Sequence, residues 1–374
     1  MAIRLRKIVS IFVLNQMFNS NLIMTKHWAG HNLRFNSSTS ILSKKLVMKE
    51  FGDPIKVVSL EEEILELPKT NEVCIKMLLA SVNPADINTI QGVYPIKPDL
   101  PAVPGSEGIG EVVAVGPNVK HLNAGDKVIP NVEAAGTWRS HALYKEEHLL
   151  KVPNDIDIIS LSGIMVNPST AYRMLKDFVN LKPGDAIIQN GANSAAGQNI
   201  IQLCKAWNIS TLNIVRNRPN INDLKMYLEN LGATHVITEE ELRTSNVGKT
   251  LKAKLALNCV GGKNALNVLR LLDHGGTMVT YGGMSRDPVT IPTSSLIFKD
   301  IKVKGFWMTR WHGENRNSSK QSEMFEDLFN LMRKGDLRPP VYRFVKLKDY
   351  REAIMNTMNV QGFTNAKYVI NFSI

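Results

Sequence analysis

A run of small residues at 191–197 is the first place in the chain where cofactor chemistry could occur. It reads Gly191-Ala-Asn-Ser-Ala-Ala-Gly197, between an apolar stretch at 186–190 and a helical pattern that extends to 207. Small residues between a strand and a helix let a pyrophosphate approach the backbone, and the helix N-terminus offers free N–H groups. The usual middle glycine is Ala195 here, so the spacing alone is also typical of an ordinary strand-to-helix turn.

A basic pair follows about 20 residues later, at the end of the next apolar stretch. Enzymes that use NAD place an acidic residue there to bind the ribose 2′-hydroxyl. This chain has Arg216-Asn217-Arg218 instead. Two guanidinium groups suit a 2′-phosphate, which a carboxylate would repel, so the pair favours NADPH over NADH. The alternative is a solvated basic pair at a strand end.

Two kinds of pattern surround these residues. Residues 46–160 consist of short apolar runs broken by glycine, proline, asparagine and aspartate, which is typical of a β-rich barrel. From about 171, apolar strands alternate with helices, which predicts an α/β fold with a parallel, doubly wound sheet. The expected strands of both parts are 73–82, 108–115, 127–130, 186–190, 211–215, 235–238, 255–260 and 277–282, and the expected helices of the second part are 193–207, 222–231 and 265–272.

Glycines and the end of the chain complete this prediction. Gly275 and Gly276 are expected to end the helix at 265–272 before the next strand begins. After about 308 a further helix carries Met324 and Leu328 on one side, and 368–372 reads as a final strand.

The start of the chain has the composition of a targeting segment. The chain has 374 residues and a formal net charge of +11, yet residues 1–49 contain eight basic residues and no acidic one. Without those eight charges the rest of the chain carries only +3, which argues against nucleic-acid binding. We expect a mitochondrial transit peptide over 1–45, cleaved between about 30 and 45. A secretory signal and a disordered tail are the alternatives, and three scattered cysteines give the secretory signal little support.

Several stretches together resemble the medium-chain dehydrogenase/reductase superfamily, and within it the mitochondrial trans-2-enoyl-CoA reductases. The superfamily likeness rests on Val82-Asn-Pro-Ala-Asp-Ile-Asn88, Pro104-Gly-Ser-Glu-Gly-Ile-Gly110, Gly125-Asp-Lys-Val-Ile129 and Leu181-Lys-Pro-Gly-Asp185. The narrower likeness rests on Gly92-Val-Tyr-Pro95, Gly136-Thr-Trp-Arg139, Val166-Asn-Pro-Ser-Thr-Ala-Tyr-Arg-Met174, His235-Val-Ile-Thr-Glu-Glu-Glu-Leu242, Leu257-Asn-Cys-Val-Gly-Gly262, Gly275-Gly-Thr-Met-Val-Thr-Tyr-Gly-Gly-Met284 and Ile297-Phe-Lys-Asp300 running to Gly305-Phe-Trp307. In this order and spacing they cover nearly everything from about 46 onward.

The resemblance implies a Rossmann domain plus a GroES-like β-rich catalytic domain built from both ends of the chain. We expect catalytic segments at 46–171 and 309–374 and an NADP-binding domain at 172–308. The implied activity is NADPH-dependent reduction of trans-2-enoyl thioesters of coenzyme A or acyl carrier protein, in mitochondrial fatty acid synthesis in the matrix. A homodimer is implied by the family alone.

The same resemblance makes Tyr94 the proton donor. Hydride addition at the β-carbon moves charge onto the thioester oxygen, and a phenol in a dry cleft can hydrogen-bond that oxygen or deliver a proton. Without the family, Tyr94 would be an aromatic turn residue beside Pro95.

Cofactor contacts carry over to positions between 167 and 367. They are Asn167, Asn193, Ser194, Ala195, Ala196, Arg216, Asn217, Arg218, Tyr281, Gly282, Gly283, Met284, Phe306, Trp307, Met308 and Lys367. The family usually has Gly and Val at the positions of Ala195 and Ala196. The alternatives are a helix N-cap for Asn167, a plain strand end for 281–284, bulky core for 306–308 and a snorkelling surface lysine for Lys367.

No metal site is expected. The segment that carries a Gly-His-Glu ligand motif in zinc alcohol dehydrogenases reads Gly105-Ser106-Glu107, and the cysteines form no C-x-x-C pair. Glu107 is expected either to order the floor of the active site or to form a structural ion pair, and Asn83 and Asp86 to hold a loop.

Two other functions remain open. One is a zinc-free quinone or 2-alkenal reductase, which would share the cofactor chemistry and differ in substrate. The other is a non-catalytic nicotinamide-binding protein, since a fold does not determine activity.

Overall fold

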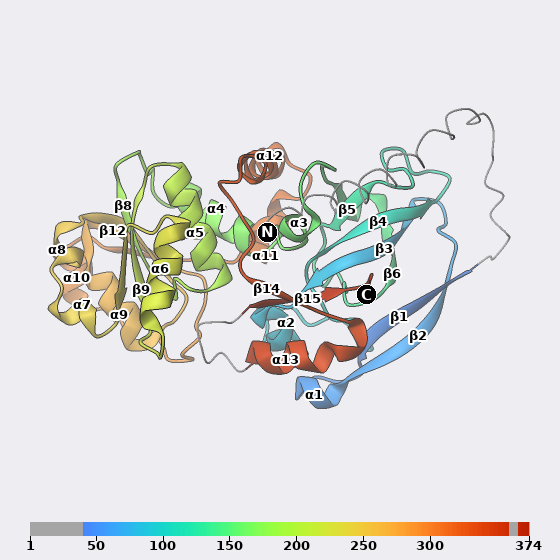
Figure 1. The fold of residues 1–374 in the computed structure, drawn as a ribbon, viewed down its shortest axis with the longest axis horizontal. Helices are drawn as coiled ribbons and strands as arrows, with labels where there is room; N and C mark the ends of the chain where they lie inside the picture. Colours follow the sequence, from blue (N-terminus) through green and yellow to red (C-terminus); the bar gives the residue numbers. More distant parts are fainter. Residues whose placement is uncertain (1–39, 359–365, 374) are drawn as a thin grey trace, which may run out of the picture. The chain divides into compact units, whose positions relative to one another are not determined.

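The computed structural model describes residues 40–358 and 366–373, which contain two large sheets and a separate hairpin (Figure 1). The first large sheet has six parallel strands in the order β10-β9-β8-β11-β12-β13. Its strands are β8 (Ala186–Asn190), β9 (Ser210–Val215), β10 (His235–Thr238), β11 (Ala253–Asn258), β12 (Leu272–Thr280) and β13 (Lys302–Gly305). The helices among them are α5 (Ala195–Ala206), α6 (Ile221–Leu231), α7 (Glu241–Thr244), α8 (Val247–Thr250), α9 (Gly262–Arg270) and α10 (Thr293–Ile297).

The register of this sheet brings the loops after its strands to one edge. Asn190 is aligned with Ile214 on β9, and Asn258 with Thr280 on β12. Thr280 is in turn aligned with Gly305 on β13. Because parallel strands end together, the segments that begin at Gly191, Arg216, Cys259, Tyr281 and Phe306 all start at the same carboxyl edge.

The second large sheet has seven strands and draws on distant parts of the chain. Its order is β14-β15-β3-β4-β5-β7, with β6 also paired to β3. All its pairs are antiparallel except β14 with β15. The strands are β3 (Glu72–Ser81), β4 (Gly108–Val115), β5 (Lys127–Pro130), β6 (His141–Lys145), β7 (Leu149–Lys151), β14 (Tyr342–Val345) and β15 (Lys367–Asn371). Strand β15, from the end of the chain, lies beside β3 and places Lys367 near the residues that follow β3.

Helices and the hairpin complete the described part. The helices outside the parallel sheet are α1 (Pro54–Val57), α2 (Pro84–Ile90), α3 (Ile158–Ser162), α4 (Asn167–Asp177), α11 (Met308–Asn315), α12 (Ser319–Lys334) and α13 (Tyr350–Met358), with short 3₁₀ turns η1 (Glu146–His148) and η2 (Leu347–Asp349). The hairpin pairs β1 (Ser40–Met48) with β2 (Val58–Glu66). None of the helices among the described residues is long and apolar enough to cross a membrane.

Close contacts with neighbouring backbone and side chains explain the glycines before and inside β4. A Cβ on Gly108 would lie 2.6 Å from the Leu79 carbonyl oxygen, and one on Gly105 would lie 2.4 Å from the Thr137 hydroxyl. Side chains at these positions would force the neighbouring segments apart, so the glycines permit tight packing of the β-rich sheet.

The role predicted for Gly275 and Gly276 as the end of the helix at 265–272 is wrong, and the strands predicted at 255–260 and 277–282 also have other limits, Ala253–Asn258 and Leu272–Thr280. Helix α9 ends at Arg270 and β12 begins at Leu272, so Gly275 and Gly276 lie inside a strand and do not end the helix. Gly275 has a φ of +72°, and the pairing of β11 with β12 shifts register between Ala253 and Leu255. The glycine pair therefore accommodates an irregular stretch of strand, which a turn signal cannot distinguish from a helix end.

Candidate active site

The glycine loop after β8 has the geometry of a phosphate-binding turn. Gly191 has a φ of +58°, and a Cβ there would lie 2.5 Å from the Cys259 sulfur. Ser194 caps α5, since its hydroxyl accepts a hydrogen bond from the Gly197 amide at 3.1 Å. A Cβ on Gly197 would lie 2.5 Å from the Ala192 carbonyl oxygen. The loop therefore needs glycine at both ends, and α5 begins at Ala195 with its N-terminus toward the carboxyl edge.

Three buried asparagines tie the strand ends together beneath that loop. The Asn190 amide nitrogen donates to the Asn258 and Asn264 side-chain oxygens, each at 2.7 Å. The Asn258 oxygen also accepts from the amides of Val260 and Gly261, at 3.2 and 3.1 Å. We call Asn190, Asn258 and Asn264 the amide network. The sequence analysis did not identify it, although Asn at the last position of two apolar strands was a visible signal.

The segment after β12 packs on the segment after β11. The Tyr281 amide donates to the Asn258 carbonyl at 2.9 Å, and the Met284 amide donates to the Cys259 carbonyl at 3.0 Å. Burial, followed by the neighbouring Cys259, raises the pKa of the Tyr281 hydroxyl well above its usual value. Gly282 lies against Cys259, whereas the Met284 side chain is 55% exposed. Tyr281 is thus a neutral aromatic group beside the glycine loop.

The basic pair lies at the end of β9, the strand next to β8. The Arg218 amide donates to the Asn217 side-chain oxygen at 2.9 Å, and the Arg218 Nε donates to the Arg216 carbonyl at 3.1 Å. Burial and then the Arg216 charge lower the pKa of Arg218. Hydrogen bonds within residues 216–218 therefore order this turn. It follows β9, the strand next to the one that leads into the glycine loop.

Tyr94 and Trp307 meet although they are far apart in the chain. The Trp307 indole nitrogen donates to the Tyr94 hydroxyl oxygen at 2.7 Å, and the rings pack edge to face with centroids 5.9 Å apart. An indole N–H can only donate, so Tyr94 accepts this bond and keeps its own proton for another acceptor. Phe306 packs edge to face against Phe178, and Met308 is buried.

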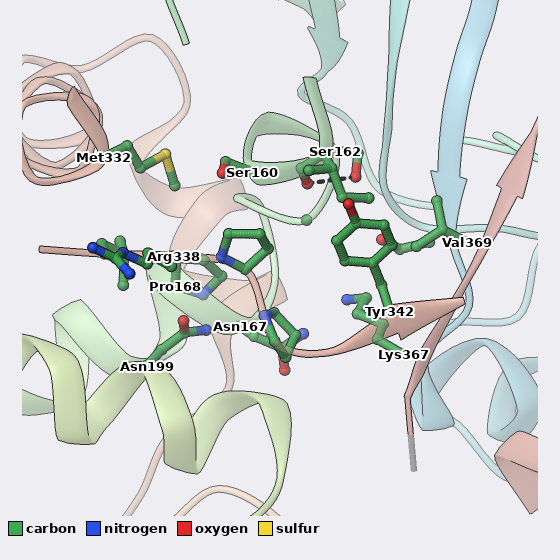
Figure 2. A pocket seen from close by; sticks show the side chains of 16 residues that line it. Ser160, Ser162, Asn167, Pro168, Asn199, Met332, Arg338, Tyr342, Lys367 and Val369 are labelled. Carbon is green, nitrogen blue, oxygen red and sulfur yellow. Dashed lines mark hydrogen bonds between the residues drawn. The ribbon is translucent and has the colours of Figure 1, made fainter. Parts of the chain in front are cut away.

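Asn167, Lys367 and Asn199 line one cleft (Figure 2). Ser81 also lines it. Ser81 and Asn199 are 1% and 2% exposed, and the Ser81 hydroxyl and the Asn199 amide nitrogen have no hydrogen-bond partner. Buried polar atoms without partners cost free energy, so this cleft suits a bound polar group. Together with the glycine loop, these features fit a dinucleotide.

Lys367 is not a surface lysine. Its side chain is 10% exposed and its ammonium lies 2.8 Å from a Glu107 carboxylate oxygen that is fully buried. Asn167 is the first residue of α4 rather than its cap, and its amide nitrogen donates to the Asn83 side-chain oxygen at 3.3 Å. Burial raises the pKa of the nearby Asp86 to about 6. The two alternatives considered for Asn167 and Lys367, a helix cap and a snorkelling chain, do not match this geometry.

The expected site residues therefore fall into separate groups. Tyr94 pairs with Trp307, and Asn167 and Lys367 meet through Asn83. Ser194 and Tyr281 belong to the loops along the carboxyl edge, and Arg216 to Arg218 lie one strand farther out. Asn193, Ala195 and Ala196 stand at the start of α5 with Ser194.

The cysteines are core residues. Cys74, Cys204 and Cys259 are buried and free, and burial raises the pKa of each thiol, to about 11 for Cys74 and Cys259. Within 40–358 and 366–373, no group of three His, Cys, Asp or Glu side chains could hold a metal ion. The expectation of a metal-free enzyme stays a prediction.

A GroES-like β-rich sheet joined to a doubly wound parallel sheet, with loops for a dinucleotide along its carboxyl edge, defines the medium-chain dehydrogenase/reductase class. Residues 69–154 match the family model described as alcohol dehydrogenase GroES-like domain. Residues 195–328 match the model described as zinc-binding dehydrogenase. The predicted fold class is confirmed.

Relatives narrow the class. The mitochondrial enoyl-[acyl-carrier-protein] reductase of Xenopus tropicalis is 44% identical over 336 residues, which is 88% of this chain and 96% of that protein. The human enzyme of the same name is 47% identical over 331 residues, 87% of this chain and 88% of that protein. The chain belongs to the family of mitochondrial enoyl-[acyl-carrier-protein] reductases, and the predicted mitochondrial localisation is confirmed.

Solved structures agree with this assignment. The complex of Etr1p with NADP and crotonyl-CoA has a TM-score of 0.83 and 36% identity, covering 89% of this chain and all of that chain. The mitochondrial 2-enoyl thioester reductase Etr1p/Etr2p heterodimer from Candida tropicalis has a TM-score of 0.82 and 35% identity, with the same coverage.

Proposed function

We propose that this protein reduces the double bond of trans-2-enoyl thioesters with NADPH in mitochondrial fatty acid synthesis. The observation that carries the proposal is the Tyr94–Trp307 pair, in which a half-buried phenol is hydrogen-bonded by an indole beside the proposed cofactor site. Relatives that share 44% and 47% identity over most of the chain are mitochondrial enoyl reductases, which supports the same substrate class. The acyl carrier is coenzyme A or acyl carrier protein.

When bound, NADPH would supply a hydride to the β-carbon of the substrate. Tyr94 then stabilises the negative charge that develops on the thioester oxygen and provides a proton for the α-carbon, directly or through water. Trp307 holds the Tyr94 oxygen at 2.7 Å and leaves the phenolic proton available. Excluding water from the site strengthens the hydrogen bonds that Tyr94 makes with the thioester oxygen and with Trp307.

The cofactor would lie along the carboxyl edge of the parallel sheet. The glycine loop and the start of α5, with Asn193, Ser194, Ala195 and Ala196, would receive the pyrophosphate. Arg216, Asn217 and Arg218 would bind the 2′-phosphate. The nicotinamide side would be enclosed by Asn167 and Lys367, together with the segments 281–284 and 306–308.

Turnover assays test this assignment. We expect rapid oxidation of NADPH with trans-2-hexenoyl-CoA, much slower oxidation of NADH, and a 10²- to 10⁴-fold lower kcat for Tyr94→Phe, as is typical for loss of a general acid. Tyr350→Phe is the matched control, because the Tyr350 hydroxyl donates at 2.7 Å to the Val58 carbonyl in the core, away from the site. Tight NADPH binding with activity on quinones or 2-alkenals alone would favour the other zinc-free reductases. Binding without turnover of any substrate would favour a non-catalytic protein.

We propose that the mature chain begins at or before Ser40. Strand β1 starts at Ser40, inside the segment 1–45 assigned to the leader, and the Leu46 amide donates to the Trp138 carbonyl at 2.9 Å. Cleavage within β1 would remove paired strand residues. N-terminal sequencing of the protein from mitochondria tests this, and a mature N-terminus after Ser40 would contradict it. The domain limits 46–171, 172–308 and 309–374 otherwise stay as proposed.

We also propose a homodimer formed through β13. This strand is the outer member of the six-stranded sheet, and Leu296, Ile297 and Phe298 beside it are 48%, 66% and 75% exposed. Such a patch next to an open strand edge favours pairing with a second copy. Analytical ultracentrifugation of wild type and Phe298→Glu tests this. We expect a dimer that weakens in the variant, and a monomeric wild type would contradict the proposal.

A further inference from the structure

A hydrogen-bonded chain of four side chains connects the fully buried Glu107 to the cleft. One Glu107 oxygen, Oε1, accepts from the Lys367 ammonium and from the Asn83 amide nitrogen, both at 2.8 Å. The other oxygen, Oε2, accepts from the Val166 backbone amide at 2.9 Å. The Asn83 side-chain oxygen accepts from Lys367 at 3.0 Å and from the Asn167 amide nitrogen at 3.3 Å. We call Glu107, Asn83, Lys367 and Asn167 the relay.

The chemistry of these groups determines the direction of every bond in the relay. An ammonium and two N–H groups surround the Glu107 carboxylate, so its oxygens only accept. Asn83 must therefore turn its NH₂ toward Glu107 and its carbonyl oxygen away. Lys367 has no acceptor atom, so its contact with the far side of the Asn83 amide requires the same orientation. Two independent partners thus fix the Asn83 amide, whose two ends would otherwise be interchangeable.

The orientation of Asn83 also determines that of Asn167, which lies at the cleft. Asn167 faces the Asn83 oxygen and must turn its NH₂ toward it. Its carbonyl oxygen is then left on the other side of the amide. Asn167 lines the cleft and is only half-buried, whereas Asn83 is 4% exposed. The relay therefore leaves the Asn167 carbonyl oxygen, together with the one amide hydrogen that does not face Asn83, for whatever occupies the cleft.

We infer that Glu107 and Asn83 are positioning residues that hold Asn167 with its carbonyl oxygen toward the nicotinamide, where it accepts a hydrogen bond from the carboxamide NH₂. This inference rests on the proposed function, which places the nicotinamide beside Asn167. The carboxamide of the cofactor has both a donor and an acceptor end. An Asn167 whose carbonyl oxygen is held toward the nicotinamide selects the NH₂ end, whereas a freely rotating Asn167 would bind either end.

A cofactor analogue separates these cases. In 3-acetylpyridine adenine dinucleotide phosphate a methyl ketone replaces the carboxamide, so the carbonyl remains and the NH₂ is lost. We would measure the dissociation constants of this analogue and of NADP⁺ for the full-length mature protein by titration calorimetry. We expect wild type to bind NADP⁺ about 3- to 10-fold more tightly, the usual effect of one hydrogen bond. In Asn167→Ala the ratio falls to about one, because the acceptor is gone.

The same ratio of dissociation constants tests the positioning roles of Glu107 and Asn83. Asn83→Ala keeps the Glu107–Lys367 ion pair and removes the acceptor that orients Asn167, so the preference for NADP⁺ should again fall to about one. Glu107→Gln is the second variant. A glutamine can turn its NH₂ toward Asn83, but Lys367 still donates to the Asn83 oxygen, so the preference should fall only in part. Asp86→Asn is the matched control. Its carboxylate is buried beside the relay and accepts from the Asn83 backbone amide at 2.8 Å, but it does not contact Asn167, so the ratio should not change.

Each outcome is decisive for one of the two proposals. A wild type that binds neither nucleotide overturns the proposed function and with it this inference. A wild type that binds NADP⁺ and turns over enoyl thioesters, but whose preference survives in Asn167→Ala, overturns the inference alone. A preference lost in Asn167→Ala but kept in both Asn83→Ala and Glu107→Gln shows that Asn167 binds the carboxamide without the relay, which overturns the positioning roles.

Discussion

The amide network and the relay both hold candidate site residues, but they are built from different groups. The amide network is neutral: Asn190 and Asn258 are the last residues of β8 and β11, and Asn264 lies in α9. The relay contains a buried carboxylate and a nearly buried ammonium, contributed by residues 260 positions apart. Burying neutral amides requires only that their hydrogen bonds be made, whereas burying charges requires that each one have its partner.

This difference affects what each region tolerates. A lost amide contact leaves a polar group that water or a small shift can satisfy in part. A lost charge in the relay leaves its partner uncompensated in a poorly solvated place. We therefore expect the relay to be sensitive to single substitutions, and the edge of the parallel sheet to be less so.

The largest expected effect comes from breaking the buried ion pair. Lys367→Met leaves the fully buried Glu107 carboxylate without its cation, and should lower the free energy of unfolding by about 3–5 kcal/mol. The double variant Glu107→Gln/Lys367→Met removes both charges and should recover most of that loss. Urea unfolding at fixed protein concentration measures both. A loss below about 1 kcal/mol for the single variant would mean that burial does not set the relay apart.

The limits of several strands could be predicted from the sequence. Strands 108–115, 127–130, 186–190 and 235–238 have the predicted limits, because apolar runs between turn residues depend on local patterning. The parallel order of the sheet then places the glycine loop and the residues after each strand at one edge, so this half of the site was predictable in principle.

The relay was not predictable in the same way. Glu107 is expected from the sequence either to order the site or to form an ion pair. No residue near it in the sequence indicates that Lys367 is its partner. The contact exists only because β15 pairs with β3 and brings the end of the chain beside Asn83. Side-chain contacts across such distances depend on tertiary packing, which neither spacing nor periodicity encodes.

A second effect of similar size appears on acidification. His312 is buried, its Nε2 lies 2.9 Å from the Met165 carbonyl oxygen, and burial lowers its pKa to about 4. Below pH 6.5 His312 becomes protonated in the unfolded chain but stays neutral in the folded protein. The free energy of unfolding therefore falls between pH 6.5 and 4, by about 3 kcal/mol in total. Unfolding across that range should show a smaller loss for His312→Gln. Equal pH dependence in both proteins would contradict this assignment.

A smaller loss is expected in the amide network. Asn258→Ala removes an oxygen that accepts from the Asn190 side chain and from two backbone amides. Because these donors are neutral and their loop can relax, the cost should be about 2 kcal/mol, below that of Lys367→Met and independent of pH between 4 and 8. Asn264→Ala, which removes a single accepted bond, is the matched control and should cost about 1 kcal/mol. A larger loss of unfolding free energy for Asn258→Ala than for Lys367→Met would reverse the comparison.

The smallest effect tests whether burial rather than charge makes the relay sensitive. Lys44 pairs with Glu62 at 3.5 Å on the hairpin, with 58% and 57% of the two side chains exposed. Water solvates both groups, so Lys44→Met should lower the free energy of unfolding by at most about 0.5 kcal/mol. High salt should remove even that difference, since exposed charges are screened. A salt-resistant loss comparable to that of Lys367→Met would show that ion pairs stabilise this protein wherever they occur, and the contrast with the neutral amide network would then reflect charge alone.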